Sequence, residues 1–211
     1  MIKTVSESQE EILLNILKLY KIDRFEIDPC YSKGNFYKGE VPEPAHAFDI
    51  EPKDPDIIQS DARDLPFIMN SVESIIFDPP FLATKGPSLR LADASNQILK
   101  RFSVFPTEPE LFKFYWQCLQ HFYDILMPKG FLIVKCQDKV SSGKQYFSHI
   151  YIHNMAMELG FYPKDLFVLH NKSKMIGKWG GNQVHAWKTN SFFWVFKKRN
   201  AKVDLNKLLE N

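Results

Sequence analysis

The sequence predicts an α/β protein built on a doubly wound, mostly parallel, seven-stranded sheet with an antiparallel strand at one edge. Short apolar runs alternate with amphipathic stretches along most of the chain, as in a parallel sheet with helices on both faces. The last two apolar runs have no convincing helix between them, which favours an antiparallel addition at an edge. The chain has 211 residues, 45% hydrophobic and 25% charged. With no visible linker, we expect one domain over residues 1–211.

Three stretches place their apolar side chains on one side of a helix. They are residues 7–20, 108–126 and 149–160. Ser6 or Ser8 can cap the first helix, since a side-chain oxygen there accepts a free backbone N–H. The segment 127–130 (Met-Pro-Lys-Gly) is expected to stop the second helix, and Gly160 to end the third.

Seven short runs read as strands because they are apolar, β-branched or aromatic and end at turn residues. They are residues 24–27, 45–50, 56–60, 75–77, 131–136, 165–170 and 191–198. The run 131–136 is almost continuously apolar, as expected for a central parallel strand.

Four acids lie at the carboxyl ends of the first four of these strands: Asp28, Asp49, Asp61 and Asp78. In an open parallel sheet the carboxyl ends of the strands meet in one crevice. A single Asp after a strand usually only starts a loop, but four in sequence make a polar line suited to amines and hydroxyls. Asp49 lies 21 residues after Asp28, the spacing of an acid that binds a ribose. Asp61 either accepts a hydrogen bond from an adenine amine or caps its own turn.

The fourth strand runs directly into Asp78-Pro79-Pro80-Phe81. The two prolines stop the strand and keep the preceding residue out of a helix. An acid beside a rigid turn and an aromatic ring suits a flat, amine-bearing base. The alternative is a turn that only terminates the strand, with Phe81 in the core. The phosphate-binding motifs GxGxxG and the Walker P-loop are both absent.

The order of these segments, over residues 20–200, resembles the class I S-adenosylmethionine-dependent methyltransferases, which have a Rossmann-like sheet. The turn at residues 78–81 resembles the (Asp/Asn/Ser)-Pro-Pro-aromatic signature of enzymes that methylate exocyclic amino groups, and looks like the DNA adenine-N6 or cytosine-N4 methyltransferases. The resemblance implies S-adenosyl-L-methionine as cofactor. It implies that the cofactor is bound by Asp28, Pro29, Cys30 and Tyr31, by Asp49 at the ribose, by Ile50 packing on the adenine, and by Asp61 and Ala62. The family's compact Gly-x-Gly after the first strand is missing here, with only Gly34 nearby.

The same resemblance implies a catalytic role for each residue of the turn. An exocyclic amine is a weak nucleophile because its lone pair is delocalised into the ring. Asp78 and the carbonyl of Pro79 each accept one N–H, while Pro80 keeps the turn rigid and Phe81 stacks on the base. No metal is expected. A target inside a duplex has to be flipped out first.

Charge is distributed unevenly along the chain. Residues 1–78 hold eight Lys/Arg and 16 Asp/Glu, whereas residues 166–203 hold eight Lys/Arg and no acid. A polyanionic partner, DNA or RNA, fits this asymmetry, and a solvated surface is the alternative. Substrate-binding loops are expected at residues 82–110 and 170–190. Their candidate nucleic-acid contacts are Lys85, Arg90, Lys172, Lys174, Lys178 and Trp179; alternatively, the second loop is a hairpin whose tryptophans pack on the domain.

The sequence therefore predicts methyl transfer from S-adenosylmethionine to an exocyclic amine of a DNA base, with adenine N6 favoured over cytosine N4. The alternatives are an RNA guanine-N2 methyltransferase and a catalytically degenerate nucleic-acid-binding subunit. Three widely separated cysteines form no disulfide or zinc pattern. No apolar run is long enough to cross a membrane and the N-terminus is polar, so a cytoplasmic protein is expected.

Overall fold

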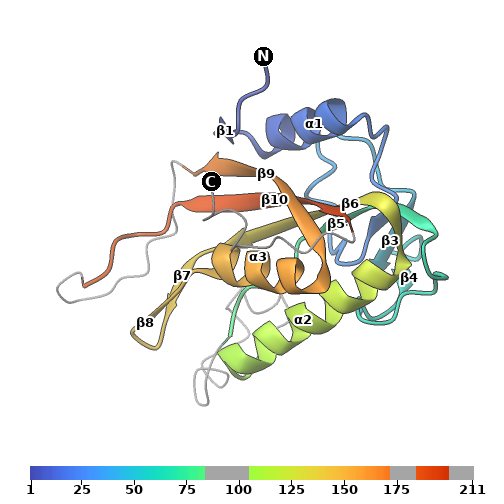
Figure 1. Ribbon diagram of the computed structural model, residues 1–211. Coiled ribbons are helices and arrows are strands. Elements are labelled where there is room, and N and C mark those ends of the chain that lie inside the picture. Colours follow the sequence, from blue (N-terminus) through green and yellow to red (C-terminus); the bar gives the residue numbers. More distant parts are fainter. Residues whose placement is uncertain (84–104, 172–183, 200–211) are drawn as a thin grey trace, which may run out of the picture.

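The computed structural model describes residues 1–83, 105–171 and 184–199, and its main feature is an eight-stranded sheet. The strand order is β1-β9-β10-β6-β5-β2-β3-β4. Helix α1 lies on one side of this sheet, and helices α2 and α3 lie on the other (Figure 1). The α/β, doubly wound fold class predicted from the sequence is confirmed.

The strands match the predicted runs, with some changes in length. They are β1 (Val5–Ser6), β2 (Ile27–Asp28), β3 (His46–Asp49), β4 (Ile58–Gln59), β5 (Val72–Phe77), β6 (Leu126–Gln137), β9 (Phe161–His170) and β10 (Asn190–Lys198). All neighbouring pairs are parallel except those of β10, which is antiparallel to both β6 and β9. The prediction of an antiparallel strand at the edge was wrong. The strand lies inside the sheet because β9 pairs on its outer side and the unpredicted β1 pairs with β9 in turn.

The helices are α1 (Gln9–Tyr20), α2 (Glu108–Ile125) and α3 (Ser148–Leu159). Ser8 is the residue that caps α1, where it accepts a hydrogen bond from the Glu11 N–H. Gly160 ends α3 in the left-handed conformation that glycine adopts most easily. Helix α2 stops as predicted, but the segment 127–130 belongs to β6, which begins immediately at Leu126.

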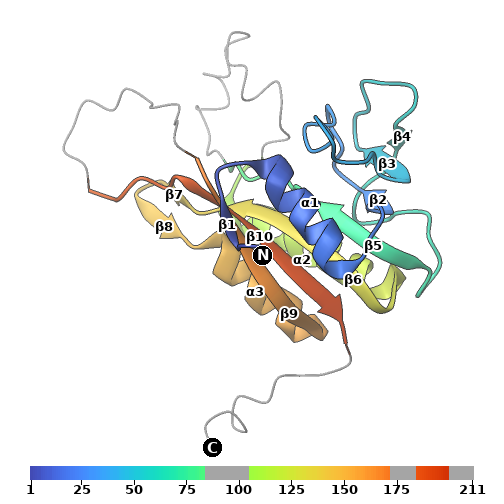
Figure 2. The same ribbon diagram turned by 90° about the horizontal axis from the view of Figure 1, so that it is seen from above.

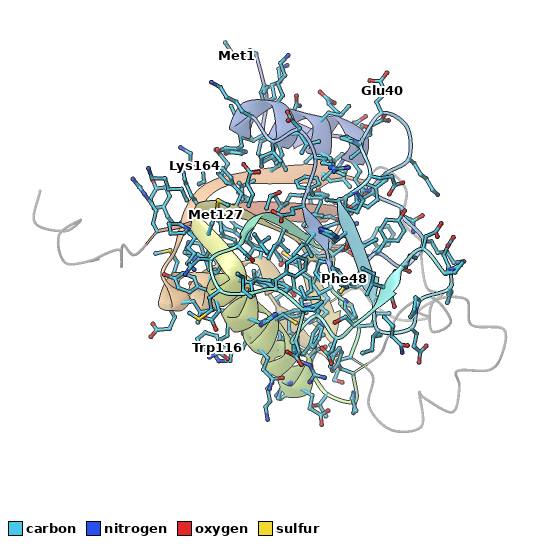
Figure 3. The ribbon with its side chains drawn as sticks, turned by 90° about the vertical axis from the view of Figure 1, so that its right-hand side faces the viewer. Met1, Glu40, Phe48, Trp116, Met127 and Lys164 are labelled. Atoms are coloured by element: carbon cyan, nitrogen blue, oxygen red, sulfur yellow. The ribbon has the colours of Figure 1, made fainter. Side chains whose placement is uncertain are left out.

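Two hydrophobic clusters cover the two faces of the sheet. In β5, Ile75 and Phe77 belong to the cluster with α2 and α3, whereas Ile76 belongs to the cluster with α1. This is the alternation of side chains expected along a strand. Side chains fill the space between the layers in Figure 3, where Phe48 marks β3 and Glu40 marks the loop that follows β2 on the α1 side. That loop contacts α1 directly, since the Glu40 N–H donates to Glu10.

A short hairpin of β7 (Lys139–Ser141) and β8 (Lys144–Tyr146) was not predicted. It follows the carboxyl end of β6 and lies beside the sheet (Figure 2). Nearby, Ala83 and Phe105 form a parallel bridge. The hairpin and this bridge flank the end of the sheet where β5 and β6 terminate.

Candidate active site

The carboxyl ends of β5, β2, β3 and β4 lie side by side, because these four strands are parallel neighbours in the sheet. The sequence-predicted acids Asp28, Asp49, Asp61 and Asp78 are therefore at one edge, as expected. Asp49 and Asp78 lie close enough to Asp28 to help raise its pKa. The predicted line of carboxylates at this edge is a feature of the fold.

Asp78 begins the turn that ends β5, and its side chain is 32% exposed. Its Oδ2 atom lies 3.1 Å from the ammonium of Lys135, which donates a hydrogen bond to it. Sequence reasoning missed Lys135. The signal was present as a single lysine inside the otherwise apolar run 131–136.

The backbone of the turn at residues 78–81 is held from two other elements. The phenol of Tyr115 on α2 donates to the Pro80 carbonyl at 2.6 Å, and Lys139 of β7 donates to the Phe81 carbonyl at 2.7 Å. Lys139 also forms a 2.7 Å ion pair with Glu108, the first residue of α2, and burial lowers the pKa of Lys139. Phe81 is half-buried. The turn is thus fixed through its carbonyls, and the Asp78 side chain is left at the surface.

Asp28 has the opposite environment, being only 2% exposed at the end of β2. Its Oδ1 accepts the Cys30 N–H at 2.9 Å and its Oδ2 accepts the Tyr37 phenol at 2.8 Å. Burial raises the pKa of Asp28 to about 7, against the lowering effect of these two hydrogen bonds. Burial also raises the pKa of Tyr37, and the Asp28 charge adds to the effect. The loop after β2 therefore uses the Asp28 carboxylate for its own packing.

The two glycines of this loop serve the same packing. Both have positive φ, +61° at Gly34 and +84° at Gly39, so a residue with a side chain would be strained there. A Cβ at Gly34 would lie 2.5 Å from the Tyr31 hydroxyl, and one at Gly39 would lie 2.2 Å from the Glu10 carboxylate. Tyr31 in turn stacks on Tyr37, with ring centroids 5.4 Å apart. The path of this loop is set by aromatic packing and by contact with α1.

Asp49 and Ile50 present a polar and an apolar group next to each other at the end of β3. The Asp49 oxygens accept the N–H groups of Ser32 and Glu51 at 2.9 and 2.8 Å. A carboxylate has about four acceptor positions, so both oxygens can still accept a hydroxyl. Ile50 is 48% exposed, so its apolar side chain is accessible to a ligand. The pair suits a ribose and the flat face of a base.

The remaining residues of the predicted cofactor site are placed as follows. Asp61 forms an ion pair of 2.5 Å with Arg63, whose hydrogen bonds lower the pKa of Asp61. Ala62 is buried in the core, Pro29 is buried, and Cys30 is half-buried with a pKa raised by burial. Asp61 therefore caps its own turn, one of the two roles expected for it, and keeps further acceptor positions on its oxygens.

The predicted nucleic-acid contacts Lys85, Arg90, Lys172, Lys174, Lys178 and Trp179 lie outside the described residues. Within the predicted loop 170–190, Trp187 is among the described residues, and it is 58% exposed. Among residues 1–83, 105–171 and 184–199, no cluster of three potential metal ligands occurs. In the same residues, no helix is both long and apolar enough to cross a membrane.

No protein-family model and no curated protein matches the chain. Solved structures do resemble it. A candidate sarcosine dimethylglycine methyltransferase from Galdieria sulphuraria has a TM-score of 0.52 at 12% identity, over 90% of this chain and 85% of that one. A candidate DNA modification methylase from Thermus thermophilus, crystallised with S-adenosyl-L-methionine, has a TM-score of 0.45 at 16% identity, over 68% and 55%. TrmN from the same organism has a TM-score of 0.48 at 17% identity, over 90% and 49%.

These similarities concern the fold. The Galdieria protein shares the fold that the strand order describes, an open, mostly parallel α/β sheet. The chain spans little more than half the length of the Thermus DNA methylases it resembles, 53% to 56%. Chemistry and substrate must therefore be argued from the residues of this chain.

Proposed function

We propose that this protein transfers a methyl group from S-adenosyl-L-methionine to an exocyclic amino group of a nucleic-acid base, with DNA adenine N6 as the favoured target and cytosine N4 second. The observation that carries the proposal is the Asp78 turn. Its backbone is held through two carbonyls, while its carboxylate stays 32% exposed at the edge where the other strand-end acids meet. A rigid acceptor at such an edge is what an amine-bearing substrate needs.

The residues at the ends of β2 and β3 fit the proposed cofactor in part. Asp49 would accept the ribose hydroxyls, and the exposed Ile50 would pack on the adenine ring. Asp28 would bind the amino-acid end through Tyr37 and the surrounding loop, whose aromatic packing replaces the usual glycine-rich turn. Pro29, Cys30, Tyr31, Asp61 and Ala62 complete the proposed site.

When bound, the cofactor supplies a methyl group on a sulfonium, which is already a strong electrophile. The protein then has to orient the weak amine. Asp78 would accept one amine N–H through its carboxylate and the Pro79 carbonyl would accept the other, which directs the nitrogen lone pair at the methyl carbon. Once the methyl group has been transferred, Asp78 or water would take the proton that the amine loses. Phe81, half-buried beside them, would stack on the base.

The test is transfer of a labelled methyl group to DNA and to RNA, followed by digestion of the product to nucleosides. We expect labelled N6-methyldeoxyadenosine from the natural protein. With Asp78→Ala we expect a loss of at least about a hundredfold in turnover and unchanged cofactor affinity by calorimetry. Label only in RNA guanosine would replace the DNA proposal by the RNA alternative. Absence of cofactor binding would favour the degenerate nucleic-acid-binding subunit.

A further inference from the structure

Lys135 and Asp78 occupy equivalent positions on neighbouring strands. In the parallel ladder Ile76 of β5 pairs with Ile133 of β6, and Phe77 pairs with Val134. The next step of this register brings Asp78 opposite Lys135. Because side chains alternate along a strand, both residues point to the same face as Ile76 and Ile133, the face covered by α1. The contact is therefore built into the sheet.

The Lys135 ammonium is enclosed by one carboxylate and two aromatic rings. It lies 3.1 Å from Asp78 Oδ2, 4.9 Å from the centre of the Phe36 ring and 5.9 Å from that of Phe193. Phe193 is the cross-strand partner of Lys135 on β10, and Phe36 comes from the loop after β2. Aromatic faces attract a cation, so these rings keep the ammonium at the carboxylate.

Only one oxygen of Asp78 is used by this contact. Of the residues that the structure describes, Lys135 is the one that donates to the Asp78 side chain, and it does so at Oδ2. Rotation of the Asp78 carboxylate is thereby restricted, and Oδ1 faces no donor from those residues. A positioned carboxylate with one available oxygen is the arrangement that an amine N–H requires.

We propose that Lys135 is a positioning residue of the transfer site: it holds Asp78 through Oδ2 so that Oδ1 accepts the N–H of the target amine. This inference rests on the proposed methyl transfer. It has a second consequence, because Lys135 places a positive charge beside the reacting groups. S-adenosylmethionine is a cation at sulfur, whereas its product S-adenosylhomocysteine is neutral. Lys135 should therefore weaken binding of the cofactor relative to the product.

The variants are Lys135→Met, which keeps the length and apolar packing of the side chain, and Lys135→Arg, which keeps the charge. Lys197→Met is the matched control, since Lys197 lies 5.1 Å from the Phe131 ring at the other end of the same β6–β10 pair. Affinities for S-adenosylmethionine and S-adenosylhomocysteine are measured by calorimetry, and kcat and KM for the nucleic acid by label transfer.

For Lys135→Met we expect kcat to fall about tenfold or more with little change in KM for the nucleic acid. We also expect the preference for S-adenosylmethionine over S-adenosylhomocysteine to rise about threefold or more. Lys135→Arg should keep the natural preference and most of kcat, and Lys197→Met should match the natural protein.

Two results would separate the possible failures. If the natural protein methylates its substrate but Lys135→Met keeps at least half of kcat and the same cofactor preference, the role of Lys135 is refuted and the proposed function stands. If the natural protein binds neither compound, the proposed function fails, and the inference about Lys135 fails with it.

Discussion

Asp28 and Asp78 end neighbouring parallel strands, yet the protein treats the two carboxylates in opposite ways. Asp28 is 2% exposed and accepts hydrogen bonds from Cys30 and from Tyr37 of its own loop. Asp78 has a side chain 32% exposed, and the turn that carries it is tied down through the carbonyls of Pro80 and Phe81. We call these two places corners of the site. The Asp28 corner, the loop after β2, is held by the Asp28 side chain, and the Asp78 corner, the turn after β5, is held by its backbone carbonyls.

The difference shows how a fold keeps a reactive side chain available. The loop after β2 donates its own N–H and O–H groups to the Asp28 carboxylate. Each of these hydrogen bonds stabilises the arrangement in which Asp28 is buried, so the acid is removed from the surface. A turn anchored at its carbonyls leaves one oxygen of its acid, Oδ1 of Asp78, available for a second partner beside Lys135. Asp28 thus organises a loop, whereas Asp78 remains accessible for the substrate contact proposed above.

The backbone-held corner depends on the buried ion pair of Lys139 and Glu108, whose side chains are 14% and 8% exposed. Replacing Lys139 by Met leaves the Glu108 charge buried without its partner. We expect the free energy of unfolding to fall by about 3–5 kcal/mol, as measured by urea denaturation. Methyl transfer should fall as well, because the Phe81 carbonyl loses its donor.

Two further variants sharpen this result. Lys144→Met changes an exposed lysine of the same hairpin and should cost less than about 0.5 kcal/mol. Combining Lys139→Met with Glu108→Gln removes both charges and should recover part of the lost stability. A cost below about 1 kcal/mol for Lys139→Met alone would mean that the backbone of the turn is held in some other way.

The side-chain-held corner should respond to pH, because the folded-state pKa of Asp28, about 7, is well above that of an unfolded chain. The folded protein keeps this proton when the unfolded chain has lost it. Stability from Asp28 is therefore complete below about pH 4 and is lost as pH rises towards and through 7. Asp28→Asn should not lose it, and the difference between the two proteins should reach up to about 4 kcal/mol at pH 8.

The measurement is the free energy of unfolding of both proteins at pH 5, 6, 7 and 8. The natural protein should lose stability relative to Asp28→Asn across this window. Parallel curves for the two proteins would show that Asp28 is not a buried, protonatable acid, and the contrast between the two corners would disappear.

Sequence patterns predicted the parts of this site that depend on strand periodicity. The strand preceding Asp78, the turn at its end and the alignment of Asp28 and Asp49 all follow from short-range rules about apolar runs and prolines. The placement of β10 inside the sheet did not follow, because pairing partners far apart in sequence leave no local signal. Strand β1, with two residues, is too short to show any periodicity.

The partners of the predicted residues were also beyond the sequence. Lys135 stood out as a charge within an apolar strand, but only the register of β5 with β6 shows that it contacts Asp78. Tyr37 and Tyr115 looked like ordinary aromatic residues, since the sequence does not reveal which carbonyl or carboxylate a phenol will reach. Tertiary hydrogen bonds of this kind join residues that are distant in the chain, as with the 35 positions between Pro80 and Tyr115.

The two corners are compared most directly by removing one tyrosine hydroxyl from each, and these variants have the smallest expected effects. Tyr115→Phe and Tyr37→Phe should each cost about 1 kcal/mol of stability. They should differ in function. Tyr115→Phe frees the Pro80 carbonyl, so kcat should fall severalfold at constant cofactor affinity. Tyr37→Phe removes a hydrogen bond that lowers the pKa of Asp28, so more Asp28 is neutral at pH 7 and the cationic cofactor should bind severalfold more weakly at constant kcat. If both variants lowered kcat, or both weakened cofactor binding, the two corners would act as one unit. The division between backbone-held and side-chain-held acids would then be wrong.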